Sequence, residues 1–297
     1  MPITQKQREQ RRKHLGGSDI PILFGLNRFR NPHDLYLDKT GKLEDKPLDS
    51  EAAMAGTLFE DGVIQYAEQT LGQIKRNQYR SADGLPIATN IDGIVMATQE
   101  PVEIKVEGLF WKLRDGWGDE GTDNTPYDVI VQAHAHMICQ KSDVCYVAAF
   151  LGGVAFRLYR IEKDDELVEI IIKKATAFWN DNVLADVPPE DVPSIESIKN
   201  IVREEGESIE INNVLVDCWL ELEAAAKGAK TKADAAKNTM LAAMGTAEIA
   251  TCELGTVTYK SQLRKSIDSK ALKAEMPEVA AKYMKESSYR VARFKKT

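Results

Sequence analysis

Two carboxylates and a lysine in the first half of the chain have the types and spacing of a group that binds a divalent cation. Ten residues separate Asp92 from the triplet Glu103-Ile104-Lys105. The triplet lies in a predicted strand, where Glu103 and Lys105, two positions apart, project from the same face. Asp92-Gly93 is predicted to form a tight turn between two strands, from which the Asp92 carboxylate can reach the same place.

Side chains of these types can act together on a phosphate. Two carboxylates bind hard divalent cations such as Mg²⁺ through oxygen. A lysine beside them orients or deprotonates a water and stabilises negative charge on a phosphate. The spacing alone is equally compatible with an exposed hairpin that carries a surface ion pair.

Two further polar residues fall near this group in the predicted elements. Glu60 lies in a predicted helix, within Gly56-Thr57-Leu58-Phe59-Glu60, beside apolar residues that would face a core. A carboxylate in such a place needs a partner or a metal. Gln132 lies in the first turns of the helix after the strands, where its amide can orient a water or a phosphate.

The apolar pattern predicts a scaffold of mixed helices and strands for these residues. Helices are expected over 20–24, 31–40, 50–71, 128–140 and 166–184, and strands over 73–79, 87–91, 93–98, 101–106, 144–151 and 154–160. Pro188, Pro189 and Pro193 then end the unit. We therefore expect a core domain over residues 1–186 and a linker over 187–212.

The remainder of the chain has a different character. Residues 213–244 read as one alanine-rich helix, 247–251 and 256–261 as a hairpin, 269–285 as a helical segment and 289–294 as a closing strand. This pattern predicts a small α+β appendage over 213–297.

Charge is distributed unevenly along the chain. The formal net charge is −7, but residues 1–18 carry +4, residues 260–297 carry +7, and the interior carries −18. Basic ends around an acidic middle fit a metal-binding centre between flanks that contact phosphates. Charge runs on solvated faces would produce the same distribution.

Composition points to a globular protein of the cytoplasm. Hydrophobic residues make up 43% of the chain and charged residues 29%, and no apolar run has the ~20 residues that a membrane span needs. The four cysteines lie far apart, as expected for reduced thiols rather than a disulfide framework or a zinc or iron–sulfur site.

Other metal and nucleotide motifs are not favoured. His134 and His136 would diverge by about 200° on a helix, so we interpret one as a packing residue and the other as a surface residue. Asp115, Asp119, Glu120 and Asp123 lack the full ligand order of a calcium loop. The chain contains no P-loop.

Seven motifs, in order and at family spacing, resemble a known family. They are Gly16-Gly17-Ser18-Asp19-Ile20, Gly25-Leu26-Asn27, Leu35-Tyr36-Leu37-Asp38-Lys39-Thr40-Gly41, Gly56-Thr57-Leu58-Phe59-Glu60, Asp92-Gly93-Ile94-Val95, Glu103-Ile104-Lys105 and Gln132-Ala133-His134-Ala135-His136-Met137. Over residues 8–185 the chain resembles the YqaJ-type viral recombinases, the branch of the PD-(D/E)xK nucleases that includes phage lambda exonuclease. The resemblance implies an α/β (α+β) restriction-endonuclease-like core, with a central mixed sheet flanked by helices.

The resemblance also implies an activity and partners. It implies a Mg²⁺-dependent exonuclease, with Mn²⁺ as a possible substitute and two ions per site, that resects double-stranded DNA from 5′ ends. The 3′ strand would pass to a single-strand annealing protein, and the enzyme would form a homo-oligomer, a ring of three in this family, in a phage or prophage context. A structure-specific or restriction-like endonuclease and a catalytically silent DNA-end-binding scaffold are the alternatives.

Carried over residue by residue, the resemblance assigns roles. Asp92 and Glu103 would bind metal with the Ile104 carbonyl, Lys105 would assist the attacking water, and Glu60 and Gln132 would support metal and water. The 5′-phosphate would be held by Ser18 at the N-terminus of its helix. Arginines before and after Ser18 would contribute, and each place offers two candidates: Arg11 or Arg12, and Arg28 or Arg30.

Overall fold

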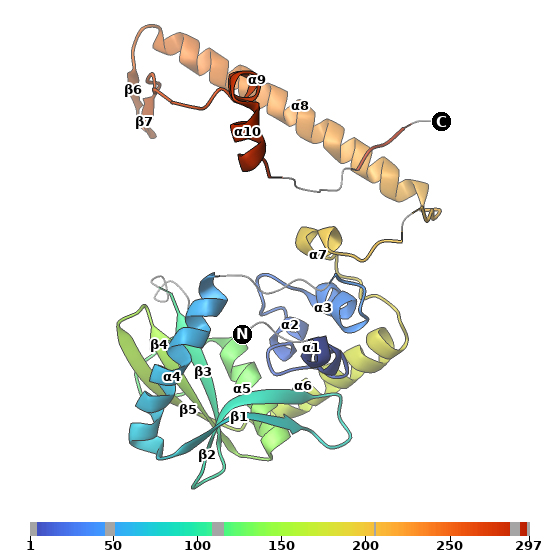
Figure 1. Cartoon of the computed structure of the whole chain (residues 1–297), viewed down its shortest axis with the longest axis vertical. Helices are drawn as coiled ribbons and strands as arrows, with labels where there is room; N and C mark the ends of the chain where they lie inside the picture. Colours follow the sequence, from blue (N-terminus) through green and yellow to red (C-terminus); the bar gives the residue numbers. More distant parts are fainter. Residues whose placement is uncertain (1–4, 45–50, 109–115, 205, 286–291, 296–297) are drawn as a thin grey trace. The chain divides into compact units, whose positions relative to one another are not determined.

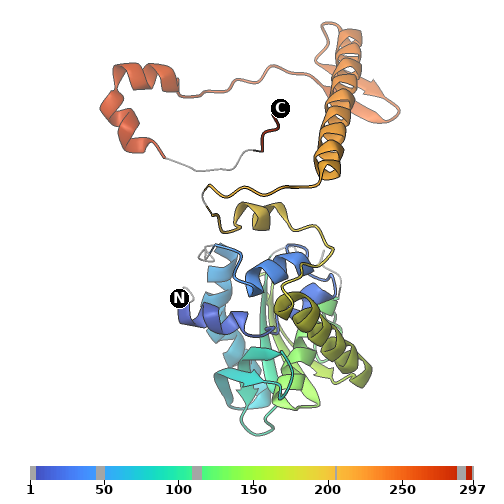
Figure 2. The same cartoon turned by 90° about the vertical axis from the view of Figure 1, so that its right-hand side faces the viewer.

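The protein divides into two compact units, Met1–Arg203 and Glu204–Thr297. The structure is a computed structural model that describes residues 5–44, 51–108, 116–204, 206–285 and 292–295 (Figures 1 and 2).

A five-stranded mixed sheet forms the centre of the first unit. Its strands are β1 (Ile74–Ser81), β2 (Ala88–Val95), β3 (Pro101–Glu107), β4 (Val144–Leu151) and β5 (Ala155–Glu162), in that order across the sheet. The β3–β4 pair is parallel, and the other neighbours are antiparallel. A parallel pair needs a crossover connection, which α5 (Tyr127–Gln140) supplies. The predicted mixed sheet flanked by helices is confirmed.

Helices cover both faces of this sheet (Figure 1). On one face α4 (Glu51–Leu71) packs Val63, Ile64 and Ala67 among apolar residues of the strands. The other face carries α5, followed outward by α2 (Ile20–Leu23) and α6 (Asp165–Ala177). Because β3 alternates, Val102 lies in the core under α4, while Glu103 and Lys105 contact α5.

The central position of α5 explains why so few of its residues are exposed. Val129, Ala133 and Met137, spaced by four, pack on β4 and β5. Val131, Ala135 and Cys139, also spaced by four, belong to the cluster that includes residues of α2 and α6. The helix is therefore apolar on two sides, and its polar residues lie in the narrow strips between these sides.

The N-terminal segment is attached to the start of β2. It contains α1 (Gln5–Arg12), which the apolar pattern did not predict, and then Leu15, which is fully buried. Leu15 N donates to Pro86 O (2.8 Å), and Ala88 N donates to Leu15 O (2.9 Å). These bonds fix the following turn, residues 16–19, over the first residues of β2.

Two short elements complete the first unit. The helix α3 (Pro32–Lys39) begins with a capping box between Asn31 and Asp34. After α6 and a π-helical segment, Phe178–Leu184, the chain reaches α7 (Ile195–Lys199). Ser194 N donates to Asp34 Oδ1 (2.8 Å), so the start of α7 is bonded to α3.

The second unit contains a long helix, a hairpin and two short helices. These are α8 (Asn213–Met244), β6 (Ile249–Cys252), β7 (Gly255–Thr258), α9 (Ser269–Glu275) and α10 (Pro277–Tyr283). Of the closing strand predicted over 289–294, residues 289–291 lie outside the described residues, and residues 292–294 form no strand. Among the described helices of both units, none is long and apolar enough to span a membrane.

Candidate active site

Four of the residues singled out by the sequence meet between β2, β3 and α5. Lys105 Nζ donates to Glu103 Oε1 (2.7 Å) and to Gln132 Oε1 (2.8 Å). Gln132 Nε2 donates to the same Glu103 oxygen at 2.7 Å. Asp92 Oδ2 accepts from Ile104 N at 2.8 Å, which places its carboxylate against β3, the strand that carries Glu103 and Lys105.

The predicted turn at Asp92-Gly93 is wrong, because β2 continues through both residues. Gly93 pairs with Arg76 of β1 and with Val102 of β3. A Cβ at Gly93 would lie 2.4 Å from Ile74 Cγ2, so the glycine accommodates a neighbouring side chain rather than a chain reversal. Asp92 therefore projects from the interior of a rigid strand, which fixes its carboxylate better than a turn would.

His136 is part of this group, although the sequence analysis did not include it. Its Nε2 lies 2.6 Å from Glu103 Oε2, and its Nδ1 lies 2.8 Å from Thr89 Oγ1. The ring is completely buried. A carboxylate oxygen only accepts, so Nε2 is the donor in this pair. The available signal was the spacing of Gln132 and His136, four residues apart on one face of a helix.

The expectation that one of the two histidines is a surface residue is also wrong. His134 and His136 are 1% and 0% exposed. They diverge as expected for positions two apart on a helix, so His134 lies among other partners. Its Nδ1 contacts Ile130 O (2.8 Å), and its Nε2 accepts from Asp164 N (3.0 Å).

The two carboxylates of the site have opposite electrostatic environments. Burial and the negative charge of Glu103 raise the pKa of Asp92 well above its usual range. Burial also acts to raise the pKa of Glu103, but Lys105 and His136 outweigh it and lower that pKa to about 2. The pKa of Lys105 is raised by Glu103 despite burial. Lys105 and His136 thus outweigh burial at Glu103, whereas at Asp92 the charge of Lys105 does not offset burial and the charge of Glu103.

This imbalance fits a divalent cation next to Asp92. Asp92, Glu103 and the Ile104 carbonyl offer oxygen donors only, which Mg²⁺ and Mn²⁺ prefer. A cation there would relieve the repulsion that raises the pKa of Asp92. Within the described ranges, no group of three or more His, Cys, Asp or Glu side chains could hold a metal ion. The candidate centre therefore consists of two carboxylates and a main-chain oxygen.

Glu60 lies on α4 and is not hydrogen-bonded to this group. Its Oε1 is 3.6 Å from Arg76 Nη2 of β1, and a quarter of its side chain is exposed. Its negative charge nevertheless contributes to the raised pKa of Asp92. Glu60 therefore influences the pKa of Asp92 through its charge, and its ion-pair partner in the structure is Arg76.

The residues expected to hold a phosphate lie on three segments. Ser18 is exposed in the turn between Leu15 and α2, Arg11 and Arg12 end α1, and Arg28 and Arg30 lie between α2 and α3. Arg30 Nη2 pairs with Asp38 Oδ2 at 2.9 Å. The Arg28 guanidinium lies over the exposed Phe29 ring, 4.9 Å from its centroid.

The helix α2 has no side-chain cap. Asp19 makes no capping hydrogen bond, and α2 has only four residues, so its dipole offers little to an anion at Ser18. Instead Asp19 Oδ2 accepts from Gly16 N (2.8 Å) and pairs with Lys39 Nζ (2.6 Å). Lys39 Nζ also donates to Arg11 O (2.8 Å). This buried pair joins the turn that bears Ser18 to α1 and α3.

Gly17 connects the same turn to the carboxylate site. A Cβ at Gly17 would lie 2.8 Å from Thr89 Oγ1 and 3.0 Å from His136 Cε1. The backbone of the turn therefore packs against Thr89 and His136, the hydrogen-bonded pair whose histidine contacts Glu103. Because Gly17 has no side chain, the turn that bears the exposed Ser18 packs closely on His136, and His136 in turn contacts the buried Glu103.

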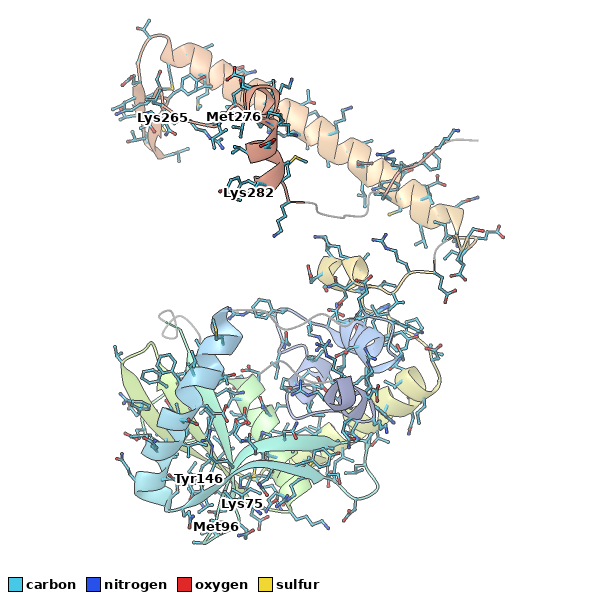
Figure 3. All side chains as sticks on the ribbon, viewed as in Figure 1. Lys75, Met96, Tyr146, Lys265, Met276 and Lys282 are labelled. Atoms are coloured by element: carbon cyan, nitrogen blue, oxygen red, sulfur yellow. The ribbon has the colours of Figure 1, made fainter. Side chains whose placement is uncertain are left out.

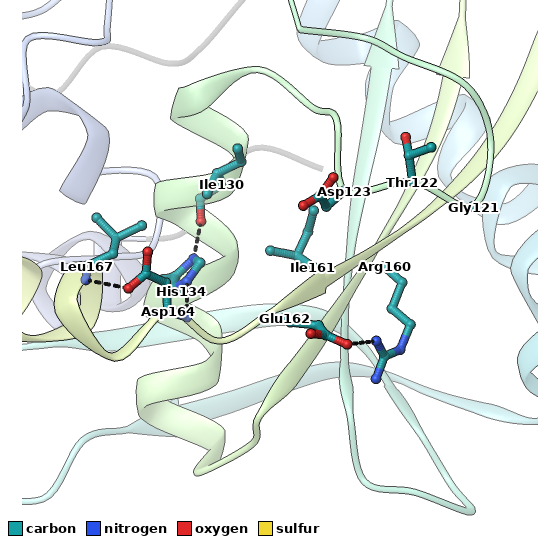
Figure 4. A pocket seen from close by; sticks show the side chains of 10 residues that line it. All are labelled: Gly121, Thr122, Asp123, Ile130, His134, Arg160, Ile161, Glu162, Asp164 and Leu167. Carbon is teal, nitrogen blue, oxygen red and sulfur yellow. Dashed lines mark hydrogen bonds and ion pairs between the residues drawn. The ribbon is translucent and has the colours of Figure 1, made fainter.

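A separate pocket of about 540 Å³ lies away from these residues (Figure 4). His134, Arg160, Glu162 and Asp164 are among its lining residues. The nitrogens of His134 are engaged by the backbone, and Arg160 pairs with Glu162. Asp92, Glu103, Lys105 and Gln132 do not line it, so the pocket and the carboxylate site are distinct.

Similar proteins agree with this architecture. The crystal structure of an alkaline exonuclease (LHK-Exo) from Laribacter hongkongensis superimposes with a TM-score of 0.50, at 17% identity, over 62% of this chain and 94% of that one. The structure of LHK-Exo in complex with dAMP gives the same TM-score and coverage at 18% identity. At this identity the likeness concerns the fold alone, and it agrees with the central mixed sheet flanked by helices.

Sequence comparison identifies the family. The model of the YqaJ-like viral recombinase domain matches residues 7–143. The uncharacterized protein YqaJ of Bacillus subtilis (strain 168) is 30% identical over 292 residues, which are 95% of this chain and 91% of that protein. The residues matched by the family model include the Gly16–Asp19 turn, the Asp92 strand and the Glu103-Ile104-Lys105 strand. The chain therefore belongs to the YqaJ-like viral recombinase family.

Proposed function

We propose that this protein is a metal-dependent exonuclease that hydrolyses linear double-stranded DNA from its 5′ ends. The observation that carries the proposal is the hydrogen-bonded group of Glu103, Lys105 and Gln132 beside the unbalanced carboxylate of Asp92. A lysine and two carboxylates in one partly buried place suit phosphodiester hydrolysis better than a surface ion pair.

Asp92 and Glu103, with the Ile104 carbonyl, would hold Mg²⁺, or Mn²⁺ in its place. When bound, such an ion polarises the scissile phosphate and lowers the pKa of a bound water. We propose two ions per site, with Glu60 as an additional carboxylate, because its charge acts on Asp92. Its bond to Arg76 is long and partly exposed, so little is lost when the carboxylate turns to the site.

Lys105 would position the attacking water. An ammonium group has three N–H donors, and Glu103 and Gln132 accept two of them. The third can donate to a water or to a phosphate oxygen. Since Gln132 also donates to Glu103, the amide fixes both partners and orients that third donor.

Ser18 would contact the terminal 5′-phosphate from the turn packed on Thr89 and His136. Its exposed hydroxyl and the exposed guanidinium of Arg28 are available to a ligand, whereas Arg30 must first leave Asp38. Arg11 and Arg12 lie on the segment that Lys39 attaches to the same turn. The basic termini would add contacts along the DNA backbone.

We propose that the resected 3′ strand passes to a single-strand annealing protein, and that the catalytic unit forms a homo-oligomer, a ring of three, around the duplex. A ring would keep the enzyme on its substrate through many cleavages.

One experiment tests the activity and its direction. A linear duplex labelled at the 5′ or the 3′ end is incubated with Mg²⁺ or with EDTA, beside a covalently closed circle of the same sequence. Loss of the 5′ label only with Mg²⁺, and an intact circle, is the expected result. A cut circle would instead favour an endonuclease, and an inert protein that still shifts the duplex would favour a DNA-end-binding scaffold.

A matched pair of lysine variants assigns the activity to the site. Lys105→Ala should lose cleavage and retain DNA binding, while Lys75→Ala, at an exposed position of β1, should retain both. Cleavage by Lys105→Ala at the wild-type rate would exclude the proposed role of Lys105.

A further inference from the structure

The long helix of the second unit has an apolar stripe with the periodicity of a coiled coil. Alternating steps of four and three residues connect Leu215, Trp219, Leu222, Ala226, Ala229, Ala233, Ala236, Met240 and Ala243. This heptad pattern runs through almost all of α8, and every position in it is apolar. We name these nine residues the α8 seam.

The α8 seam is uncovered in the structure. No residue of α8 is buried, and Leu215 and Leu222 are 66% and 65% exposed. The side-chain hydrogen bonds that we find for the helix run within it, such as Lys230 to Asp234 and Thr231 to Lys227 O. Hydrophobic side chains elsewhere in the unit, including Met276, which is labelled in Figure 3, are also solvent-accessible.

We propose that the α8 seam is a self-association surface, on which α8 of a second copy of this chain packs antiparallel. One register places eight of the nine seam positions of one helix opposite a seam position of the other, and leaves only Ala243 outside the paired region. Leu215 then faces Met240, Trp219 faces Ala236, Leu222 faces Ala233 and Ala226 faces Ala229, each pair occurring twice about a two-fold axis. The proposal does not depend on the proposed nuclease activity.

The sizes of the seam residues favour this orientation. In the antiparallel register Trp219 and Leu222 meet alanines, and Leu215 meets the flexible Met240. In a parallel pair each would meet its own copy, while the alanines of the second half would face alanines and leave gaps. Cores are filled best when large and small residues alternate across an interface.

Charge favours the same orientation. Residues 213–226 carry Asp217, Glu221 and Glu223 and no basic residue, a net charge of −3. Residues 227–244 carry four lysines and Asp234, a net charge of +3. Antiparallel pairing sets each acidic half against a basic half, and parallel pairing sets like against like. Glu223 and Lys230 occupy the same flanking position of the heptad and come within one turn of each other across the antiparallel pair.

The available area indicates a concentration-dependent dimer. Thirty-two residues make a helix of about 48 Å, and a contact strip about 10 Å wide buries about 500 Å² per copy. The total of about 1,000 Å² is at the lower limit for a specific interface. Self-association should therefore be measured over a range of protein concentrations.

The first test is sedimentation equilibrium of the full chain. We expect a species of twice the mass of the Leu222→Lys variant, whatever oligomer the first unit forms. Ala224→Lys is the matched control, because this exposed alanine lies on the helix face opposite the seam. Equal mass for wild type and Leu222→Lys, or an equal loss in the control, would overturn the proposal. Circular dichroism verifies that each variant keeps its helix.

The second test determines orientation. Glu223→Lys and Lys230→Glu should each weaken self-association at least several-fold, and the double reversal should restore it. With Cys218 and Cys252 replaced by serine, Leu215→Cys and Met240→Cys should form a disulfide dimer when mixed, but not separately. A disulfide dimer of Leu215→Cys with itself would overturn the antiparallel arrangement. A monomer that binds only a different protein or DNA through the seam would overturn self-association.

Discussion

Replacing His136 by phenylalanine tests whether this residue orients the Glu103 carboxylate. The exchange keeps a ring of similar size in a completely buried position and removes the donor that lies 2.6 Å from Glu103 Oε2. Glu103 keeps Lys105 and Gln132 on its other oxygen. A hydrogen bond to a buried charged group contributes about 1.5–3 kcal/mol, so we expect a loss of that size in the free energy of unfolding.

The functional effect should appear in the metal requirement. Loss of a residue that orients a metal ligand typically costs about 10- to 100-fold in metal affinity or activity. We therefore expect the Mg²⁺ concentration for half-maximal cleavage to rise by about that factor. Mg²⁺ should also raise the thermal midpoint of this variant by less than it raises that of wild type. An ion that binds the native state stabilises it, and a more weakly bound ion stabilises it less. His136→Gln, which supplies an amide N–H donor, should recover part of both effects.

His134→Phe is the matched control. It removes a histidine of the same helix, buried to the same extent, whose partners are Ile130 O and Asp164 N. It should lower stability and leave the Mg²⁺ requirement unchanged. If the two phenylalanine variants show the same Mg²⁺ requirement, the reasoning that His136 orients Glu103 is refuted.

Four further outcomes are expected. Glu103→Gln should abolish cleavage without loss of DNA binding in a gel-shift assay; loss of both would indicate a structural role. Ser18→Ala should cleave 5′-phosphorylated and 5′-hydroxyl duplexes at equal rates, whereas wild type prefers the phosphate; a retained preference would exclude Ser18. Gly17→Ala should cost about 1–3 kcal/mol in urea unfolding, because its Cβ would lie 2.8 Å from Thr89 Oγ1; unchanged stability would show that the turn moves freely. Asp34 is fully buried, and hydrogen bonds from Asn31, Ser197 and Ser194 lower its pKa despite that burial. A lowered folded-state pKa stabilises the fold above the ordinary value of 3.8, and this contribution disappears as pH falls through the folded pKa. Asp34→Asn should therefore be less stable than wild type at pH 7, by a difference that narrows below pH 3.8; a constant difference would contradict this assignment.

The packing of Gly17 has a consequence for the whole site. The turn that bears Ser18 contacts Thr89 and His136, and His136 contacts Glu103. A displacement of the turn by a bound phosphate would therefore reach the carboxylate through two contacts. Phosphate recognition and metal binding should be coupled in this protein, and the Ser18 and His136 variants together can measure that coupling.

Local pattern was sufficient to predict much of the scaffold. The alternation of strand residues placed Glu103 and Lys105 on one face, and the structure shows both against α5. The alanine-rich sequence of 213–244 predicted α8, whose bounds are Asn213–Met244. Such features depend on neighbours in sequence, which is why they can be read from it.

Tertiary contacts decided the features that local pattern predicted wrongly. Gly93 resembles a turn residue, but Ile74 of the adjacent strand requires a glycine there. Asp19 resembles a helix cap, but Lys39, twenty residues later, binds it in the folded chain. The pattern of α5 alone could not show which of its sides meets β3, so His136 was read as a packing or surface residue. The sequence by itself determined the elements and the candidate chemistry; only the packing of α5 and of the Gly17 turn on the sheet decided which side chains hold Glu103, because those contacts join residues far apart in the chain.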